Sequence, residues 1–338
     1  MTRYVPTRRK RAGMTLVELL VVVAILSLLS VVVIPTLSGN QEERSSRAAA
    51  EQVRSIFSQA RIEATVEGRW AGVTLRPVTA SSTAAIDLFR CLSPSAYRGD
   101  ALNSRLIFTL STGTGTLSVA PDTLGCLASI EAVGVEQYDL VKFDDRGPTY
   151  EISSAPRAAG FQISLRNSSA ADNAGQTADN TPWPPENVPM TFAIDRKPVI
   201  SGSPLTLGQS RCVDLAWSGF GTSSAFTTFP AGATVSVVFD GQGQVRKVFV
   251  SDGSRFSVNG PVLLLVGRFD RAGNAYNANG GLGASDDSLG ANWQYPTSYW
   301  VGIDPSTGQM RTAECAAGAT TPEPSRAYVR RSLEAQGL

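Results

Sequence analysis

A single carboxylate, Glu18, lies inside an otherwise apolar run that extends from Met14 to Ile34. A charge placed in hydrocarbon costs roughly 2.5–3.5 kcal/mol on insertion scales. A cation that pairs with this carboxylate would offset the cost, and the attraction would be strong in a medium of low dielectric. We therefore expect Glu18 to have a partner that offsets this cost.

The chain lacks the side chains on which most enzymatic catalysis depends. It contains no histidine, which excludes Ser-His-Asp and Cys-His catalysis and His-ligated zinc. Only four lysines are present: Lys10, Lys142, Lys197 and Lys247. Carboxylates alone can still catalyse reactions, but the usual combination of catalytic groups is missing. We expect no enzymatic activity, no catalytic residue and no cofactor.

Basic residues are concentrated at the amino terminus. Five of the 30 lysines and arginines fall within the first 13 residues, which contain no acidic residue. The remainder has 25 basic against 29 acidic residues, a net charge of −4. A slightly acidic body argues against broad binding of nucleic acid. The arginines Arg326, Arg330 and Arg331 near the carboxyl terminus could bind phosphates, but a solvated tail explains them as well.

Four cysteines, Cys91, Cys126, Cys212 and Cys315, lie too far apart in the chain for a CxxC metal or redox motif. In an exported protein they predict two disulfides. Proximity in the sequence favours the pairs Cys91–Cys126 and Cys212–Cys315. Four buried thiols are the alternative.

Oxygen-bearing side chains gather in the loop 268–292, which makes it a weak candidate for calcium binding. The candidate ligands are Asp270, Asn274, Asp286 and Asp287. Their spacing does not fit an EF-hand, and a solvated loop rich in Asn and Gly is the simpler interpretation. We expect no metal site.

The apolar run that holds Glu18 has the length of a membrane helix. Its 21 residues would span about 31 Å at ~1.5 Å per residue, close to the ~30 Å hydrocarbon core of a bilayer. The basic leader before it predicts a cytoplasmic amino terminus and an exported body. A secretory signal peptide would be shorter and followed by a cleavage site of small residues. An ordinary anchor would not explain Gly13 and Glu18.

The stretch "RAGMTLVELLVVVAILSLL" resembles the class III signal of type IV pilins and type II secretion pseudopilins. This resemblance implies that a prepilin peptidase cleaves after Gly13 and that the new amino terminus at Met14 is N-methylated. Glu18 then stands at position 5 of the mature chain, where the resemblance implies that it pairs with the cationic amine of a neighbouring subunit. Pro35 stands at mature position 22, where pilins commonly carry a proline, so the resemblance implies that both residues act in assembly. The alternative for Pro35 is a helix stop at the membrane surface.

We expect one helix over residues 14–67, with residues 14–34 in the membrane after a leader of residues 1–13. In its second half, Val53, Ile56, Phe57, Ala60 and Ala64 recur at helical spacing and predict a face that packs on a β-rich domain. Gly68 is a natural residue to end the helix. Short apolar runs separated by turns predict that residues 68–315 form this exported domain. The predicted class is α+β, with antiparallel strands and a flexible tail over residues 316–338.

A second, weaker resemblance concerns the body. "ARIEATVEGRWAGVTLRP" is similar to the junction of helix and first strand in the GspH/FimT family of minor pseudopilins and pilins, and "VFDGQGQVRKV" and "VGIDPSTGQMRT" resemble its late hairpins. The family's globular part is usually shorter, so residues 78–235 are interpreted as an enlargement.

Together these features predict a non-enzymatic minor pseudopilin of a type II secretion system, which supports protein export across the outer membrane. The expected partners are the prepilin peptidase, other pseudopilins or pilins and the inner membrane, with the globular domain in the periplasm. Two alternatives stay open. One is a minor type IV pilin for DNA uptake or adhesion, and the other is a membrane-anchored periplasmic binding domain or enzyme.

Overall fold

The computed structural model of this chain describes residues 16–111, 116–122, 125–145, 147–165, 183–208, 210–221, 224–226, 232–251, 255–258, 260–279, 289–316, 318 and 320–334. For residues 28–41 it describes only the helical backbone. The chain divides into two compact units, Met1–Ser45 and Ser46–Leu338.

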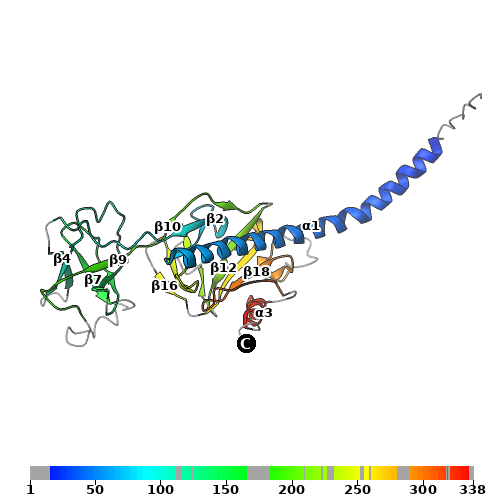
Figure 1. Cartoon of the computed structure of the whole chain (residues 1–338). Helices are drawn as coiled ribbons and strands as arrows, with labels where there is room; N and C mark the ends of the chain where they lie inside the picture. The colour runs from blue at the N-terminus through cyan, green and yellow to red at the C-terminus, as the bar shows by residue number, and fades with distance from the viewer. Residues whose placement is uncertain are drawn as a thin grey trace, which may run out of the picture. The chain divides into compact units, whose positions relative to one another are not determined.

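Helix α1 spans Leu16–Glu67 and belongs to both units (Figure 1). It is continuous through position 35, so a helix stop at Pro35 does not occur. It ends where predicted, because Gly68 adopts a positive φ of 64°, which costs glycine nothing. Its second half buries the predicted apolar face: Val53, Phe57, Ala60 and Ala64 are fully buried.

Antiparallel strands form a large sheet and a smaller one, which confirms the α+β class. Among the described residues the large sheet has twelve strands, and its main path runs β16-β15-β14-β1-β2-β12-β17-β18-β19. These strands are β1 (Ala71–Pro77), β2 (Ala84–Leu92), β10 (Val199–Ile200), β11 (Leu205–Thr206), β12 (Arg211–Phe220), β13 (Ser224–Ala225), β14 (Val235–Phe239), β15 (Val245–Val250), β16 (Arg255–Ser257), β17 (Val262–Arg268), β18 (Tyr299–Ile303) and β19 (Met310–Glu314).

The two hairpins predicted from turn residues are present in this sheet. β14 pairs with β15 around the turn at Asp240–Gly243, and β18 pairs with β19 around the turn that contains Pro305 and Gly308. Glycine at position 308 fits the turn because its φ is +64°. Both hairpins follow from local turn chemistry.

The two faces of the large sheet pack against different helices. Alternate residues of a strand point to opposite faces. In β17, Leu264 and Val266 join α1 in one core, whereas Leu263 and Leu265 join a second core with helix α3 (Glu323–Glu334). The ring centroids of Phe57 in α1 and Phe239 in β14 lie 6.4 Å apart with an edge-on geometry.

The described residues of the predicted flexible tail 316–338 are folded onto the body over residues 323–334. This segment contains α3, whose Val329 and Leu333 are buried against the sheet. Gly302 in β18 makes this contact possible, because a Cβ there would lie 2.6 Å from Cγ1 of Val329. Helix α3 has few apolar residues, and the strands on which they pack lie far away in the sequence. Helical periodicity alone therefore did not predict this packing.

A second lobe is inserted between β2 and β10, inside the predicted enlargement 78–235 (Figure 1). Its strand order is β8-β3-β4-β7-β6-β5-β9, and it has a hydrophobic core of its own that includes Phe108, Ile130 and Ile152. The predicted single domain 68–315 is therefore built around two sheets. The strands of the lobe are β3 (Leu106–Ser111), β4 (Thr116–Pro121), β5 (Leu140–Phe143), β6 (Tyr150–Ile152), β7 (Phe161–Leu165), β8 (Pro189–Met190) and β9 (Phe192–Asp195).

Candidate functional site

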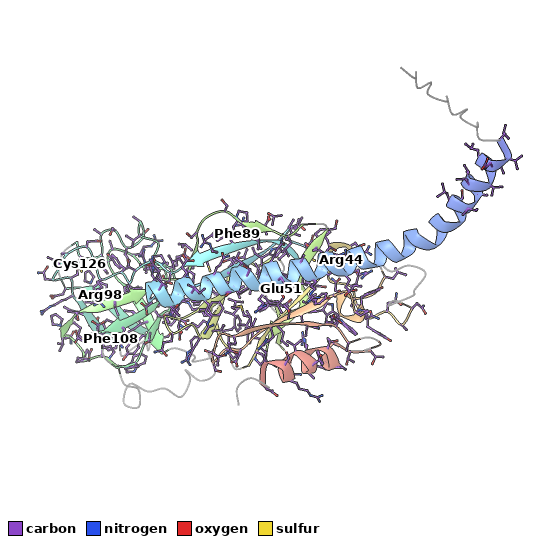
Figure 2. The ribbon with its side chains drawn as sticks, turned by 45° about the vertical axis from the view of Figure 1, so that its right-hand side comes forward. Arg44, Glu51, Phe89, Arg98, Phe108 and Cys126 are labelled. Carbon is purple, nitrogen blue, oxygen red and sulfur yellow. The ribbon has the colours of Figure 1, made fainter. Side chains whose placement is uncertain are left out.

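The first turns of α1 expose apolar side chains on every side (Figure 2). Leu16 is 80% exposed, Val17 69% and Leu20 62%, and the neighbouring valines, leucines and isoleucine up to Leu26 are at least 41% exposed. Successive residues of a helix are rotated by about 100°, so this set covers the whole circumference. A helix that is apolar all round is normally buried in a core or a membrane. These turns therefore form a surface that a protein core or a membrane would cover.

Glu18 lies in the first turn of α1. A carboxylate at this end of a helix is favoured by the helix dipole, because the unpaired N–H groups there carry partial positive charge. The position is consistent with the predicted ion pair to an amine near residue 14. Gly13 and Met14 lie outside the described residues, as does the side chain of Pro35.

The predicted membrane segment 14–34 falls partly outside the described side chains. In the part of the chain that the structure describes, no helix is both long and apolar enough to span a membrane.

No disulfide joins any two of the four cysteines, so the predicted pairs Cys91–Cys126 and Cys212–Cys315 are wrong for this structure. The thiols belong to different parts of the fold. Cys126 lies in the core of the inserted lobe, and Cys315 lies in the core beneath α3. All four side chains are buried, which is the alternative that the sequence left open. Burial raises the pKa of Cys91 to about 12, which keeps this thiol protonated and unreactive.

Of the four calcium candidates in the loop 268–292, the structure describes Asp270 and Asn274, and each is engaged in another contact. The Asp270 carboxylate pairs with the guanidinium of Arg268, which lowers the pKa of that carboxyl. The Asn274 amide donates to the Gly290 carbonyl at 3.5 Å, and Asp286 and Asp287 lie outside the described residues. No cluster of metal ligands occurs among the described side chains.

The three arginines near the carboxyl terminus do not form a basic patch either. Arg326 is buried, and it pairs with Glu323 at 3.4 Å and donates to the Trp217 carbonyl. Arg330 pairs with the same glutamate at 3.3 Å. Of the three, only Arg331 is exposed.

Two further buried carboxylates were missed by the sequence analysis, and the first is Asp214 in β12. The carboxylate is fully buried and accepts hydrogen bonds from the Asn292 amide at 3.0 Å and from the N–H groups of Gly273 and Ala216 at 3.2 Å. It therefore ties two loops to the large sheet. Burial raises the pKa of Asp214 to about 6, and the hydrogen bonds counteract this effect only in part.

The raised pKa of Asp214 predicts a pH-dependent stability. Well below pH 3.8 the carboxyl is protonated in both the folded and the unfolded chain, and well above pH 6 it is charged in both. Between these limits the folded state binds the proton more tightly, so the free energy of unfolding falls as pH rises. A shift from 3.8 to about 6 corresponds to about 3 kcal/mol.

The Asp214→Asn variant isolates this contribution, because every other titrating group stays in place. We expect the difference in unfolding free energy, wild type minus variant, to fall by about 3 kcal/mol between pH 3 and pH 7. Urea unfolding at pH steps across this window measures it. A difference that does not change with pH would refute the assignment.

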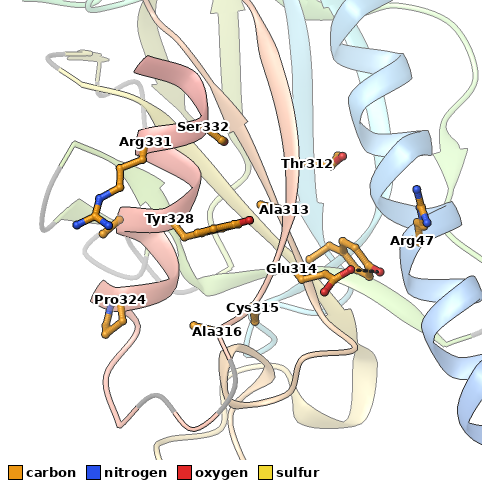
Figure 3. Close-up of a pocket in the computed structure, with 12 residues that line it drawn as sticks. Arg47, Thr312, Ala313, Glu314, Cys315, Ala316, Pro324, Tyr328, Arg331 and Ser332 are labelled. Carbon is orange, nitrogen blue, oxygen red and sulfur yellow. Dashed lines mark hydrogen bonds between the residues drawn. The ribbon is translucent and has the colours of Figure 1, made fainter. Parts of the chain in front are cut away.

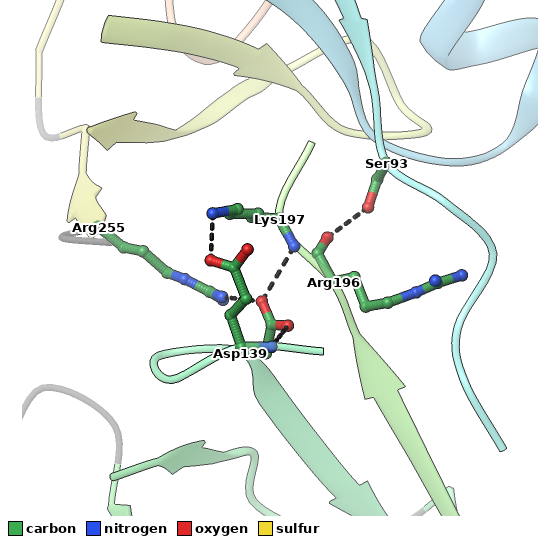
Figure 4. Close-up of polar contacts among 6 residues, drawn as sticks. Ser93, Asp139, Arg196, Lys197 and Arg255 are labelled. Carbon is green, nitrogen blue, oxygen red and sulfur yellow. Dashed lines mark hydrogen bonds and ion pairs between the residues drawn. The ribbon is translucent and has the colours of Figure 1, made fainter. Parts of the chain in front are cut away.

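The second buried carboxylate, Asp139, joins the inserted lobe to the large sheet (Figure 4). Its oxygens accept hydrogen bonds from the N–H groups of Glu136 and Lys197 at 2.8 and 3.0 Å. The guanidinium of Arg255, in β16, donates to the same carboxylate at 2.6 Å. Beside this pair, Ser93 donates to the Arg196 carbonyl at 2.6 Å, so the two segments that lead into and out of the lobe are also tied together.

Comparison with known proteins supports the amino-terminal assignment. Residues 8–34 match a family model described as the prokaryotic N-terminal methylation motif. The match contains Gly13, Met14 and Glu18. The chain therefore carries a prepilin-type signal, which implies processing by a prepilin peptidase and assembly with other pilins. Neither the search of curated proteins nor that of solved structures gave a match.

Proposed function

We propose that the protein is a minor pseudopilin of the GspH/FimT type, which assembles into the pseudopilus of a type II secretion system and supports export across the outer membrane. The observation that carries the proposal is the methylation motif over residues 8–34 together with the apolar turns of α1 that follow it. These turns are exposed on all sides around Glu18. A filament core or a membrane is the environment that would cover them.

In this proposal residues 14–34 anchor the subunit in the inner membrane before assembly. The basic leader keeps the amino terminus in the cytoplasm, because positive charges near a membrane helix are retained on that side. The body, from residue 68 onward, then lies in the periplasm.

A structural role is proposed for the body because its buried charges serve the fold. Asp214 ties two loops to the sheet, and Asp139 holds the lobe through Arg255. Both carboxylates accept several hydrogen bonds from within the fold. The inserted lobe favours a minor subunit of the filament over a major one. A major subunit is repeated along the whole filament, and an additional lobe on every copy would be hard to accommodate in dense packing.

The mass of the mature protein tests the assignment to this group. We expect membrane-extracted protein to begin at an N-methylated Met14, without the 13-residue leader. Intact-mass and amino-terminal peptide mass spectrometry would show this, with a strain that lacks prepilin peptidase as the control. A chain that still begins at Met1 in a strain with active peptidase would contradict the proposal.

A deletion strain separates the two filament systems. Accumulation of secreted proteins in the periplasm is expected for a pseudopilin. Loss of DNA uptake with normal secretion would instead assign the chain to a type IV pilus.

A further inference from the structure

The last strand of the large sheet, β19, leaves one of its edges open. It pairs with β18 on one side, and among the described residues no strand pairs with it on the other. The Cys315 N–H donates to the Ser298 carbonyl at 3.0 Å, and the Gln309 carbonyl accepts from Asp304 at 2.9 Å. In an antiparallel ladder, hydrogen-bonded residues alternate with outward-facing ones. The N–H and C=O groups of Thr312 and Glu314 therefore face away from β18.

The outward direction is confirmed one step along the chain. The N–H of Ala316, which has the same parity as Thr312 and Glu314, donates to the hydroxyl of Ser325 in α3 at 2.8 Å. In the part of the chain that the structure describes, the N–H groups of Thr312 and Glu314 donate to no turn or loop carbonyl. The strand at the opposite edge of the sheet, β16, has only three residues and offers a shorter edge than the five residues of β19.

Two hollows follow the open edge along its whole length. The larger, of about 740 Å³, has Thr312–Ala316 as its floor, with Arg47 of α1 on one wall and Tyr328 and Arg331 of α3 on the other (Figure 3). The smaller, of about 250 Å³, continues along residues 308–311 beside Arg54, Ser58 and Arg61 of α1. We call these two hollows together the edge groove. Its floor includes Thr312 and Glu314, whose outward-facing N–H and C=O groups are what an added strand requires.

The walls of the edge groove are mainly basic. Arg47, Arg54 and Arg61 recur every seven residues along the flank of α1. Arg54 is paired with Glu51 at 3.1 Å, but no ion pair of Arg47 or Arg331 is present among the described residues.

Two acidic side chains lie at the same edge and are already engaged. Glu51 accepts a hydrogen bond from Thr312 at 3.1 Å, and Glu314 accepts one from Tyr299 at 3.4 Å. The groove as a whole is therefore complementary to an acidic ligand. The exposed ring of Tyr328 adds an apolar surface on the α3 side.

We propose that the edge groove binds an extended acidic segment of a partner protein, which adds to β19 as a further strand of the sheet. Its backbone pairs with Thr312 and Glu314. Its side chains alternate between the two walls, so carboxylates on opposite faces meet Arg47 on one side and Arg331 on the other. This site is independent of the proposed place in a filament, because it lies in the body and does not involve residues 8–34.

The test uses the purified full chain in detergent and a fluorescein-labelled synthetic peptide of eight residues. Glu-Asp pairs in the peptide place carboxylates on both faces of an extended chain. Fluorescence anisotropy at 0.15 M salt measures affinity. Thr312→Pro removes the outward N–H, a change that edge strands tolerate, and should weaken binding at least tenfold. The matched control, Thr312→Ala, keeps the N–H and should bind within twofold of wild type. Arg47→Gln and Arg331→Gln should each weaken binding about fivefold.

Hydrogen exchange on the wild-type chain keeps the test independent of how well Thr312→Pro folds. The peptide should slow exchange of the amides of Thr312 and Glu314 but leave those of Arg311 and Ala313 unchanged. A peptide with the acids replaced by lysine should not bind. Equal affinity of Thr312→Pro and Thr312→Ala, or unchanged exchange at Thr312, would overturn the proposal. Binding of a ten-nucleotide oligothymidylate with the same affinity as the peptide would also overturn the proposal, because it would show that the groove binds anions in general.

Discussion

Glu18→Ala is expected to abolish stable assembly of the protein with its filament partners while leaving processing intact. In the proposed filament, cleavage after Gly13 creates a positively charged amine at Met14, and the amine of one subunit meets Glu18 of a neighbour. Removal of one partner of a buried ion pair costs about 3–5 kcal/mol, because the remaining charge is left without compensation. This corresponds to more than a hundredfold in an equilibrium constant.

Co-purification of the other pseudopilins from solubilised membranes measures the effect. Glu18→Asp keeps the charge on a shorter side chain and should assemble better than Glu18→Ala. Glu43→Ala is the matched control, since Glu43 is an exposed carboxylate of the same helix outside the apolar run. All three variants should begin at Met14, because the leader is unchanged. A processed Glu18→Ala protein that assembles at wild-type levels would show that the carboxylate has another purpose.

Arg255→Met is expected to loosen the inserted lobe from the large sheet. The variant leaves the fully buried Asp139 without its cation, and the loss of one partner of such a pair costs about 3–5 kcal/mol. Burial already raises the pKa of Asp139, and Arg255 lowers it. In the variant the pKa of Asp139 should therefore rise further. Limited proteolysis should cut the connecting segments 93–97 and 196–199 faster than in the wild type.

A double-mutant cycle with Asp139→Asn separates the pair from the packing of the two side chains. The double variant should be more stable than Arg255→Met alone, because no uncompensated charge remains in the interface. Chemical unfolding gives the coupling energy. Arg98→Gln is a control, since Arg98 pairs with Asp145 at an exposed position, where ion pairs contribute about 0–1 kcal/mol. Additive effects of Arg255→Met and Asp139→Asn would contradict the role of the pair.

Features that depend on neighbouring residues were predictable from the sequence. The apolar face of α1 from Val53 to Ala64 follows from helical spacing, and the helix end follows from a glycine at position 68. The two hairpins follow from turn residues between apolar runs. The prepilin-type signal lies within 27 consecutive residues, 8–34, so it could be recognised without any tertiary structure.

Features that depend on residues far apart in the chain were decided by the tertiary structure alone. Cys91 and Cys126 are the closest pair of cysteines in sequence, yet one lies at the large sheet and the other in the lobe, so proximity in the chain gave the wrong pairing. The pairing of Asp139 with Arg255 joins positions 116 residues apart. The open edge of β19 could not be predicted either, because strand order determines which strand lies last in a sheet. Local pattern thus determined the helix, the hairpins and the export signal. Long-range packing decided the lobe, the buried charges and the edge groove, since burial and strand neighbours depend on the whole fold.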